Sequence, residues 1–256
     1  RTHKVGTKIS REYKILSVLK GCPYTVQMLN TFYSVNEEGV TVQNIVFEYV
    51  SNNLDNEIEK LKSKKEVFDI KELQTICSQI LEGLVFAHKK NVVHRDLKPE
   101  NVLYTNEKMV KICDFGSSKI ILKKKSALNF GKESSDSNSE DEKEVDTTFY
   151  NRNGIITKST PYIVSRYYRA PELILGCNTY DSSIDIFACG CIFFELAALK
   201  PLFPGRAEGM QLFEQMTVLG ILPKDYLDSF PCGKLLKSLV SRIQDINKLS
   251  LNLQLQ

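Results

Sequence analysis

The sequence predicts an α+β protein, because segments of helical periodicity occur beside short runs rich in β-branched and aromatic residues. The clearest helix is 69–89, where apolar residues recur every three or four positions. The clearest strand signal is 40–50, "VTVQNIVFEYV", which fits one long strand or a pair of strands. At 256 residues the chain is long enough for one large domain or for two lobes.

Four further elements complete the prediction. Residues 10–20 carry apolar positions at helical spacing, with Ser10 as the expected N-cap. Residues 109–115, "MVKICDF", indicate another short strand. Residues 182–199 form an apolar helix with few polar breaks, which we expect to be central and buried, and residues 208–220 form another helix.

Composition excludes several classes of protein. The hydrophobic content of 42% and the charged content of 25% are ordinary for a globular domain, and the net charge of +3 favours neither nucleic acid nor membrane as a partner. No apolar run reaches the roughly 18 residues of a membrane span, and no signal peptide opens the chain. The seven cysteines lack CxxC spacing, so we expect reduced thiols and a cytoplasmic or nuclear location, with Cys189 and Cys191 buried rather than metal-binding.

Residues 123–158 differ in composition from the rest of the chain. Seven Asp or Glu lie between Glu133 and Asp146, with almost no apolar residues among them. Such a segment buries too little surface to offset its ordering entropy, so we predict disorder. A regulatory role and a tolerated insertion both remain open, because lengthening a loop costs little.

The chemistry is concentrated on either side of that segment. "VVHRDLKPENVLY" (92–104) places charged and amide side chains between apolar runs, which suggests a rigid scaffold that presents polar groups to a ligand. Asp96 and Asn101 have the spacing of the HRD-x-x-x-x-N motif, and "DFG" (114–116) and "APE" (170–172) follow in order. Over about residues 10–222 the chain therefore resembles a eukaryotic protein kinase, which implies a bilobal fold, ATP and Mg²⁺ as cofactors, and protein substrates.

The resemblance gives the catalytic residues their roles. Phosphoryl transfer requires an oriented hydroxyl group and neutralised phosphate charge. Asp96 would accept or orient the proton of the substrate hydroxyl, and Lys98 would reach the transferring phosphate. Asn101 and Asp114 offer the hard oxygen ligands that Mg²⁺ prefers. Asp185 matches the buried acid that anchors the backbone of this loop in the family.

The same resemblance implies a nucleotide site along "NIVFEYV". One aromatic residue of this stretch would stand behind the adenine as the gatekeeper, and backbone groups of the residues that follow it would bind the adenine edge. The implied residues are the gatekeeper Phe47, the backbone of Glu48 and Val50, Leu103 as pocket floor, Cys113 before DFG, and Glu12 in the ion-pairing position. For each apolar residue alone, plain core packing is the competing interpretation.

Three further stretches, "SRYYRAPELILG", "YDSSID" and "LFPG", are similar to the group that holds cyclin-dependent, mitogen-activated and glycogen synthase kinases. "SREYKIL" and "KICDFGSSK" favour the glycogen synthase kinase-3 branch, which implies Tyr162 as the activation-segment phosphorylation site. Thr160 together with Tyr162 would instead suit a mitogen-activated kinase.

That branch also implies a basic pocket for a phosphate already present on the substrate. Its members would be Arg11, Arg95 and Lys119, three cations from separate segments that an anion could hold together. The competing occupants are a phosphorylated Thr160 of the chain itself and the acidic stretch 133–146.

The sequence departs from the family at its start. It contains no GxGxxG and no VAIK-like strand, and the ATP-binding lysine, about a dozen residues before Glu12 in relatives, would fall just before Arg1. We therefore expect residues 1–50 to be a partial N-lobe and residues 51–256 to be the C-lobe, and turnover by this chain is doubtful. The alternative function is a pseudokinase or docking module that binds other proteins without catalysis.

Overall fold

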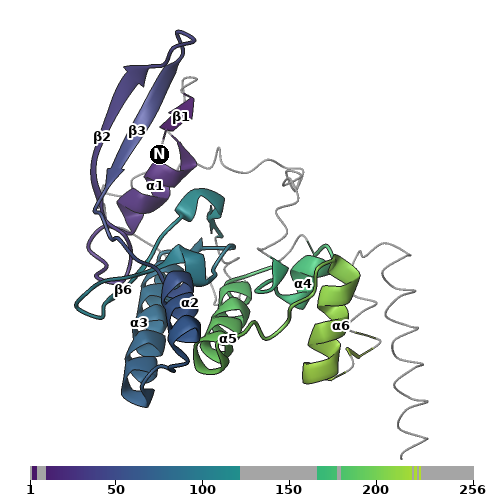
Figure 1. Ribbon diagram of the computed structural model, residues 1–256. Helices are drawn as coiled ribbons and strands as arrows, with labels where there is room; N and C mark the ends of the chain where they lie inside the picture. Colours follow the sequence, from purple (N-terminus) through teal and green to yellow (C-terminus); the bar gives the residue numbers. More distant parts are fainter. Residues whose placement is uncertain are drawn as a thin grey trace, which may run out of the picture.

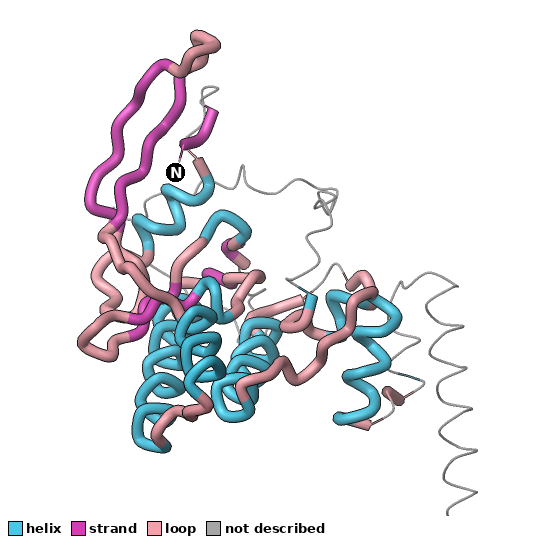
Figure 2. Tube along the Cα trace, viewed as in Figure 1, coloured by secondary structure: helices cyan, strands magenta, loops and turns pink. Residues whose placement is uncertain are grey.

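The structure is a computed structural model that describes residues 2–4 (as backbone), 10–121, 166–177, 180–220, 222, 223 and 225. A β-sheet with one helix forms one end of the described part, and the remaining helices gather at the other end (Figures 1 and 2). This is the mixed α+β content that the sequence predicts. The division at residue 50 stays a prediction.

The sheet has three antiparallel strands in the order β1-β3-β2, with bounds β1 Thr2–Lys4, β2 Met28–Val35 and β3 Thr41–Phe47. The stretch 40–50 is therefore a single strand rather than a strand pair. Its partner β2 was not predicted, because most of its side chains are exposed and give no alternation of buried and exposed positions. In the pairing, Thr31 lies opposite the buried Ile45.

Helix α1 (Arg11–Val18) confirms the first predicted helix and its cap. The Ser10 side chain accepts a hydrogen bond from the Tyr13 amide at 3.3 Å, which satisfies one free N–H of the first turn. Ile15 and Leu16 are buried. The helix packs against the turn η2 (Phe115–Ser117), so it lies beside the DFG motif.

Helix α2 (Leu54–Lys64) was missed by the sequence prediction. Its charged residues obscure a narrow apolar stripe of Leu54, Ile58 and Leu61, which are buried at the spacing of one helix face. Asn53 caps it by accepting from the Asn56 amide at 2.9 Å. The helix packs against η1 (Pro99–Asn101) and so supports the candidate site.

Helix α3 (Ile70–Lys89) agrees with the predicted range, and Ile76, Ile80 and Leu84 of its apolar periodicity are buried. Leu81 and Val85 share this apolar periodicity but are 39% and 50% exposed. The core face also includes Gly83 and Ala87, where small side chains allow close approach. A Cβ atom at Gly83 would lie 3.0 Å from the Ile112 side chain.

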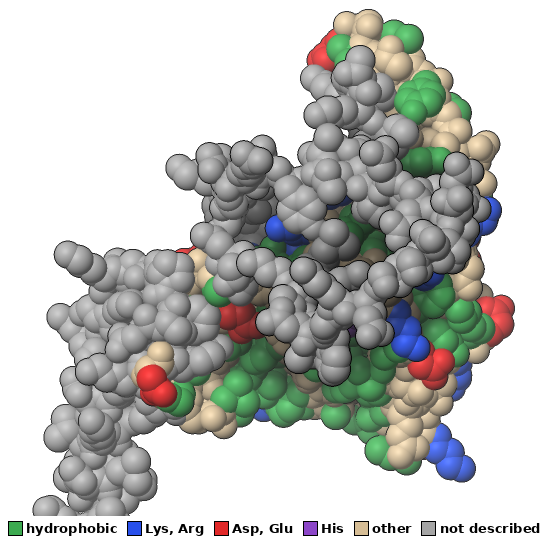
Figure 3. Space-filling view, turned by 180° about the vertical axis from the view of Figure 1, so that it is seen from behind, with side chains coloured by type: hydrophobic (Ala, Val, Ile, Leu, Met, Phe, Trp, Pro, Cys, Tyr) green, Lys and Arg blue, Asp and Glu red, His purple; other side chains and the backbone are tan. Residues whose placement is uncertain are grey.

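Helix α5 (Ser183–Ala198) packs against α3. It has more buried residues than either of the helices at 171–174 and 208–219. The expectation that it is central and buried holds for one face only, since Ile186 and Phe194 are 49% and 37% exposed. Helix α6 (Glu208–Leu219) confirms the last predicted helix, and the short α4 (Pro171–Ile174) packs on it. In the view from behind, hydrophobic side chains cover much of the described surface over the helices (Figure 3).

Two small antiparallel pairs frame the candidate site. β4 (Val92–Val93) pairs with β7 (Lys119–Ile120), and β5 (Val102–Tyr104) pairs with β6 (Val110–Ile112). The strand expected over 109–115 is therefore shorter, because Asp114 turns into the left-handed region at φ 62° and ends it. The segment 123–158, Thr160 and Tyr162 lie outside the described residues.

Two further observations concern composition. Six cysteines among the described residues are free thiols, and Cys189 and Cys191 are buried, as expected. In the part of the chain that the structure describes, no helix combines the length and apolar character needed to cross a membrane.

Candidate active site

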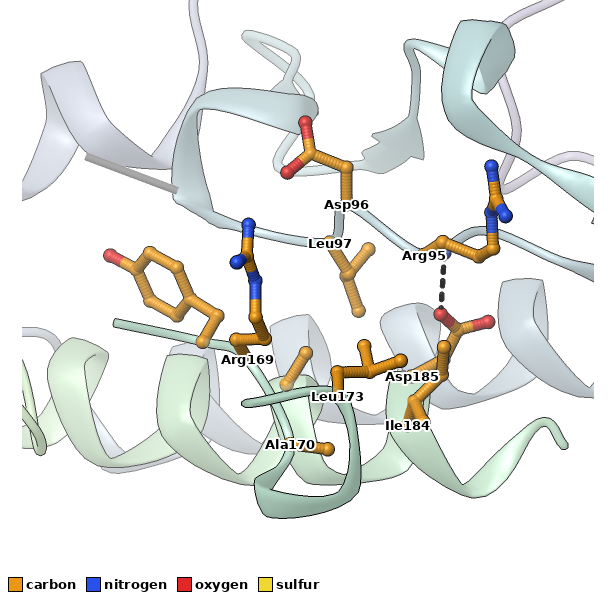
Figure 4. A pocket seen from close by; sticks show the side chains of 10 residues that line it. Arg95, Asp96, Leu97, Arg169, Ala170, Leu173, Ile184 and Asp185 are labelled. Atoms are coloured by element: carbon orange, nitrogen blue, oxygen red, sulfur yellow. Dashed lines mark hydrogen bonds between the residues drawn. The ribbon is translucent and has the colours of Figure 1, made fainter. Parts of the chain in front are cut away.

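The loop 94–101, called the catalytic loop below, leaves β4 and is fixed from beneath by Asp185 of α5. The Asp185 carboxylate is 1% exposed and accepts hydrogen bonds from the backbone amides of His94 at 2.8 Å and Arg95 at 2.9 Å. These bonds hold the Arg95 backbone at φ 71°, a conformation that residues other than glycine rarely adopt. The anchoring role expected for Asp185 is thus supported by its geometry (Figure 4).

A third donor on this carboxylate was not expected from the sequence. His88, in the last turn of α3, places Nε2 at 2.9 Å from the Asp185 Oδ2 atom. The contact links α3, α5 and the catalytic loop. No sequence signal distinguishes His88 from an ordinary residue near a helix end.

His94 connects the catalytic loop to the DFG turn. Its Nε2 atom donates to the Cys113 carbonyl at 2.8 Å, so its Nδ1 atom is the acceptor for the Asp96 amide at 3.3 Å. The ring is 1% exposed and meets the buried Phe115 ring edge-on at 5.0 Å. One neutral imidazole therefore orients both Asp96 and the residue before Asp114.

Asp96 lies among donors that come from its own loop. The Lys98 ammonium is 3.5 Å from Asp96 Oδ2, and the Asn101 amide donates to the Asp96 carbonyl at 2.8 Å and to Oδ2 at 3.4 Å. The Asp96 side chain is 29% exposed, so it remains accessible from solvent. The structure thus brings Asp96, Lys98 and Asn101 together as the sequence predicts.

Neighbouring Glu100 has no predicted role. Burial raises the pKa of its carboxyl group, and Lys98 opposes that shift in part. Its Oε2 atom is buried, and no described residue bonds to it.

Asn101 and Asp114 fit the role of Mg²⁺ ligands. The side-chain nitrogen of Asn101 donates to Asp96, so the side-chain oxygen points away from that bond. The backbone carbonyl of Asn101 accepts from the Cys113 amide at 2.9 Å. Asp114, held in a left-handed turn, accepts from the Gly116 amide at 3.3 Å through one oxygen. The two residues supply an amide oxygen and a carboxylate, a donor set suited to a hard cation that also binds phosphate.

The segment after β3 is fixed by side chains in a way that leaves backbone groups for a ligand. The Glu48 amide donates to the Gln27 carbonyl at 3.0 Å, and its carboxylate accepts from the Gln27 amide at 2.8 Å and pairs with Lys111 at 3.0 Å. Among the described residues, nothing is bonded to the Glu48 carbonyl or to the Val50 backbone. These are the groups expected to meet an adenine edge.

The predicted apolar wall lies at the border of the core. Phe47, Leu103 and Cys113 are each partly buried and pack against the same hydrophobic cluster. Glu12 is buried at 3% exposure on the helix that packs against the DFG turn. Phe47, Leu103 and Cys113 therefore pack against the core with part of each side chain, and the remaining part of each is exposed.

The three cations of the predicted phosphate pocket lie on adjacent segments. The Arg95 guanidinium donates to the Ser117 carbonyl at 2.5 Å and bonds the Tyr180 hydroxyl at 2.7 Å. Lys119 is exposed two residues beyond Ser117, and Arg11 is exposed at the start of α1. The sequence prediction did not include Tyr180.

A small cavity opens beneath Asp96. Its lining comes from the catalytic loop, the segment before α4, α4 itself and α5, and includes Arg95, Leu97, Arg169, Leu173 and Asp185. The Arg169 guanidinium extends up toward the catalytic loop beside Asp96 (Figure 4). Sequence reasoning assigned no role to Arg169, although it directly precedes the APE motif.

This geometry places an oriented acid, a nearby ammonium and an amide oxygen on a loop anchored to a buried helix, with the Asp114 carboxylate on the adjoining DFG turn, and it has the groups that phosphoryl transfer requires. The family model described as "Protein kinase domain" matches residues 1–245, and the chain belongs to the protein kinase family.

Relatives named as kinases support the same assignment. The chain is 31% identical over 234 residues to "Probable serine/threonine-protein kinase glkA" of Dictyostelium discoideum, covering 91% of this chain and 41% of the relative. It is 34% identical over 220 residues to "Cyclin-dependent kinase-like 4" of Mus musculus (86% and 52%) and over 190 residues to "Cyclin-dependent kinase 2" of Caenorhabditis elegans (73% and 43%). The chain thus spans about half or less of the length of these relatives.

Proposed function

We propose that the protein to which this chain belongs transfers the γ-phosphate of ATP to Ser or Thr hydroxyl groups of protein substrates. The observation that carries the proposal is the arrangement around Asp96. Its backbone is fixed through Asp185 and His94, and its carboxylate lies beside Lys98 and Asn101. A docking module would not need an accessible acid held in this way.

In this function each residue has a separate task. Asp96 orients the substrate hydroxyl and accepts its proton, while the Lys98 ammonium offsets charge on the transferring group. The Glu48 carbonyl and the Val50 backbone bind the adenine edge against Phe47 and Leu103. MgATP supplies the phosphoryl group and a cation that neutralises it, and Asn101 and Asp114 would hold that cation.

The test is substitution of the proposed base. Asp96→Asn keeps the size of the side chain and removes the charge, so the turnover of a general protein substrate such as myelin basic protein should fall by at least about 100-fold, the lower end of general-base contributions. Glu37→Gln, an exposed acid in the β2–β3 turn, is the matched control and should keep wild-type turnover. Both variants are made in the protein to which this chain belongs: equal turnover by the Asp96→Asn protein would refute the assignment, and a wild-type protein that never shows turnover would favour the docking function.

We further propose that the substrates are primed, meaning that they already carry a phosphate when they bind. The support is the placement of Arg11, Arg95 and Lys119 on adjoining segments, with the Arg95 guanidinium bonded only to neutral groups among the described residues. Such a cation can exchange a neutral partner for a phosphate oxygen at a gain. This preference corresponds to the glycogen synthase kinase-3 branch, with Tyr162 as the phosphorylation site. A mitogen-activated type, with both Thr160 and Tyr162 modified, is the alternative.

Two measurements separate these possibilities. Primed and unprimed forms of one peptide are compared on the wild-type protein, and then on the Lys119→Ala and Arg11→Ala variants. An advantage for the primed peptide that both substitutions abolish supports the proposal, whereas an advantage that survives both contradicts it. Mass spectrometry of active protein decides between Tyr162 alone and Thr160 with Tyr162.

A further inference from the structure

The segment before α4 is held at three successive residues by buried side chains. The three contacts are the Gln211 amide to the Tyr167 carbonyl at 3.1 Å, the Tyr168 hydroxyl to Glu195 at 2.6 Å, and the Gln215 amide to the Arg169 carbonyl at 2.8 Å. Two of these donors belong to α6, whose side chains thus reach across to a segment about 45 residues earlier in the chain. The backbone that precedes the APE motif is therefore fixed by side chains of the helices in addition to its own local turn.

Gln215 is the unusual member of this set. Its side chain is 2% exposed, and its Oε1 atom is buried with no hydrogen-bond partner among the described residues. An unpaired buried carbonyl costs stability, and an apolar side chain of similar size would avoid that cost. The amide orientation follows from the Arg169 bond, because the reversed amide would place two oxygen atoms against each other.

The role of the Gln215 amide can be separated from that of Gln211. Gln211 also accepts from the Gly205 amide at 3.0 Å, so it holds the loop that leads into α6 as well as Tyr167. The Gln215 side chain has a single hydrogen bond in the described structure, and that bond goes to Arg169. The buried Gln215 amide therefore lowers stability through its unpaired oxygen, and its one hydrogen bond fixes the position of the Arg169 backbone.

Arg169 in turn faces the candidate active site. Its amide donates to the Arg166 carbonyl at 3.1 Å and its carbonyl is held by Gln215, so both of its backbone polar groups are fixed. Its side chain lines the cavity beneath Asp96, and the guanidinium reaches toward the catalytic loop (Figure 4). A polypeptide that presents a hydroxyl to Asp96 would meet this guanidinium, which can donate to backbone carbonyls or to an anionic side chain.

We propose that Gln215 is a positioning residue for the acceptor polypeptide, acting through Arg169. It holds the Arg169 backbone so that the guanidinium stands beside Asp96 where the protein substrate binds, and it has no part in nucleotide binding. This inference rests on the proposed kinase function and names the residues that bind its protein substrate.

The test is Gln215→Met in the protein to which this chain belongs, which keeps the side-chain length and removes both the amide donor and the unpaired oxygen. The KM for myelin basic protein, and its Kd by fluorescence anisotropy, should rise about tenfold, the scale of one lost hydrogen bond, while the KM for ATP stays unchanged. Hydrogen exchange should accelerate in a peptide that covers residues 166–173. Gln74→Met, on the exposed face of α3, is the matched control and should change none of these quantities.

Three outcomes would overturn the proposal. The first is an unchanged Kd and unchanged exchange in the Gln215→Met protein. The second is a drop in Tm with lower kcat and an unchanged KM for protein substrate, which is the signature of a merely structural residue. The third is that Arg169→Met leaves the protein-substrate Kd unaltered, because Gln215 could not then act through Arg169. A wild-type protein that binds myelin basic protein without turnover would instead contradict the kinase function, and the Kd and exchange data would still decide the role of Gln215.

Discussion

Substitution of Asp185 by Asn tests whether the catalytic loop is held by the buried helix beneath it. The carboxylate accepts from two backbone amides and from His88, all within 2.9 Å. An Asn side chain keeps one acceptor oxygen and turns an NH₂ group toward a remaining donor. At least one of these donors is then left without a partner in a site that is 1% exposed.

The expected magnitude follows from the bonds that are lost. A hydrogen bond to a charged group contributes about 1.5–3 kcal/mol, and an orphaned buried donor adds its desolvation cost, so we expect the free energy of unfolding to fall by about 2–4 kcal/mol. For a chain of this size about 1 kcal/mol corresponds to roughly 2–4 °C in Tm, so Tm should fall by roughly 4–16 °C.

The assay combines a global and a local readout. Thermal and urea unfolding report the change in stability, with Glu37→Gln as the control for loss of a carboxylate on the surface. Amide exchange at His94 and Arg95 should accelerate more than exchange in α3, because these two amides lose their acceptor. A Tm within 2 °C of the wild type together with unchanged exchange at both amides would refute the anchoring role.

Three further predictions concern packing, titration and capping. Gly205→Ala should lower the free energy of unfolding by about 1–3 kcal/mol, because a Cβ atom there would overlap the Gln211 backbone. A Cβ atom at Gly190 meets nothing within 4 Å, so Gly190→Ala should be neutral or stabilising. Equal Tm values for the two variants would contradict the packing argument. Burial raises the pKa of Glu195 above its ordinary value of 4.5, so above that pH the folded protein holds the carboxyl proton more tightly than the unfolded chain does. The folded protein therefore loses stability as the pH rises above that value. Glu195→Gln removes this loss, and its stability relative to wild type should be greater at pH 7 than at pH 5 in urea titrations; a pH-independent difference would exclude the raised pKa. Ser10→Ala removes the cap of α1 and should cost about 1 kcal/mol, measured by thermal unfolding, and no change would show that water caps the helix equally well.

The sequence was most informative where local chemistry decides the outcome. Ser10 caps α1 because a hydroxyl next to an apolar-periodic segment satisfies a free amide of the first turn, and that requires no distant contact. The long α3 follows from periodicity in the same way, within one residue of its predicted start. The spacing of Asp96 and Asn101 places both on one short loop, and the structure adds that the Asn101 amide donates to the Asp96 carbonyl at 2.8 Å.

The structure decided whatever depends on partners far away in the chain. Leu81 and Val85 share the periodicity of the buried residues of α3, but only tertiary packing selects Gly83 and Ala87 for the core, since close approach to Ile112 needs small side chains. The strand β2 gave no signal because its pairing with β3, not its own burial pattern, makes it a strand.

The same distinction holds within the candidate site. The sequence by itself determined which acids, amides and cations are available, because motif spacing fixes their order along the loop. Only the tertiary structure decided that His88 joins Asp185, that Tyr180 holds Arg95, and that Gln215 fixes Arg169, since these pairs are between 46 and 97 residues apart. A hydrogen bond between distant residues depends on how the helices pack, and no local pattern of residue types records that packing.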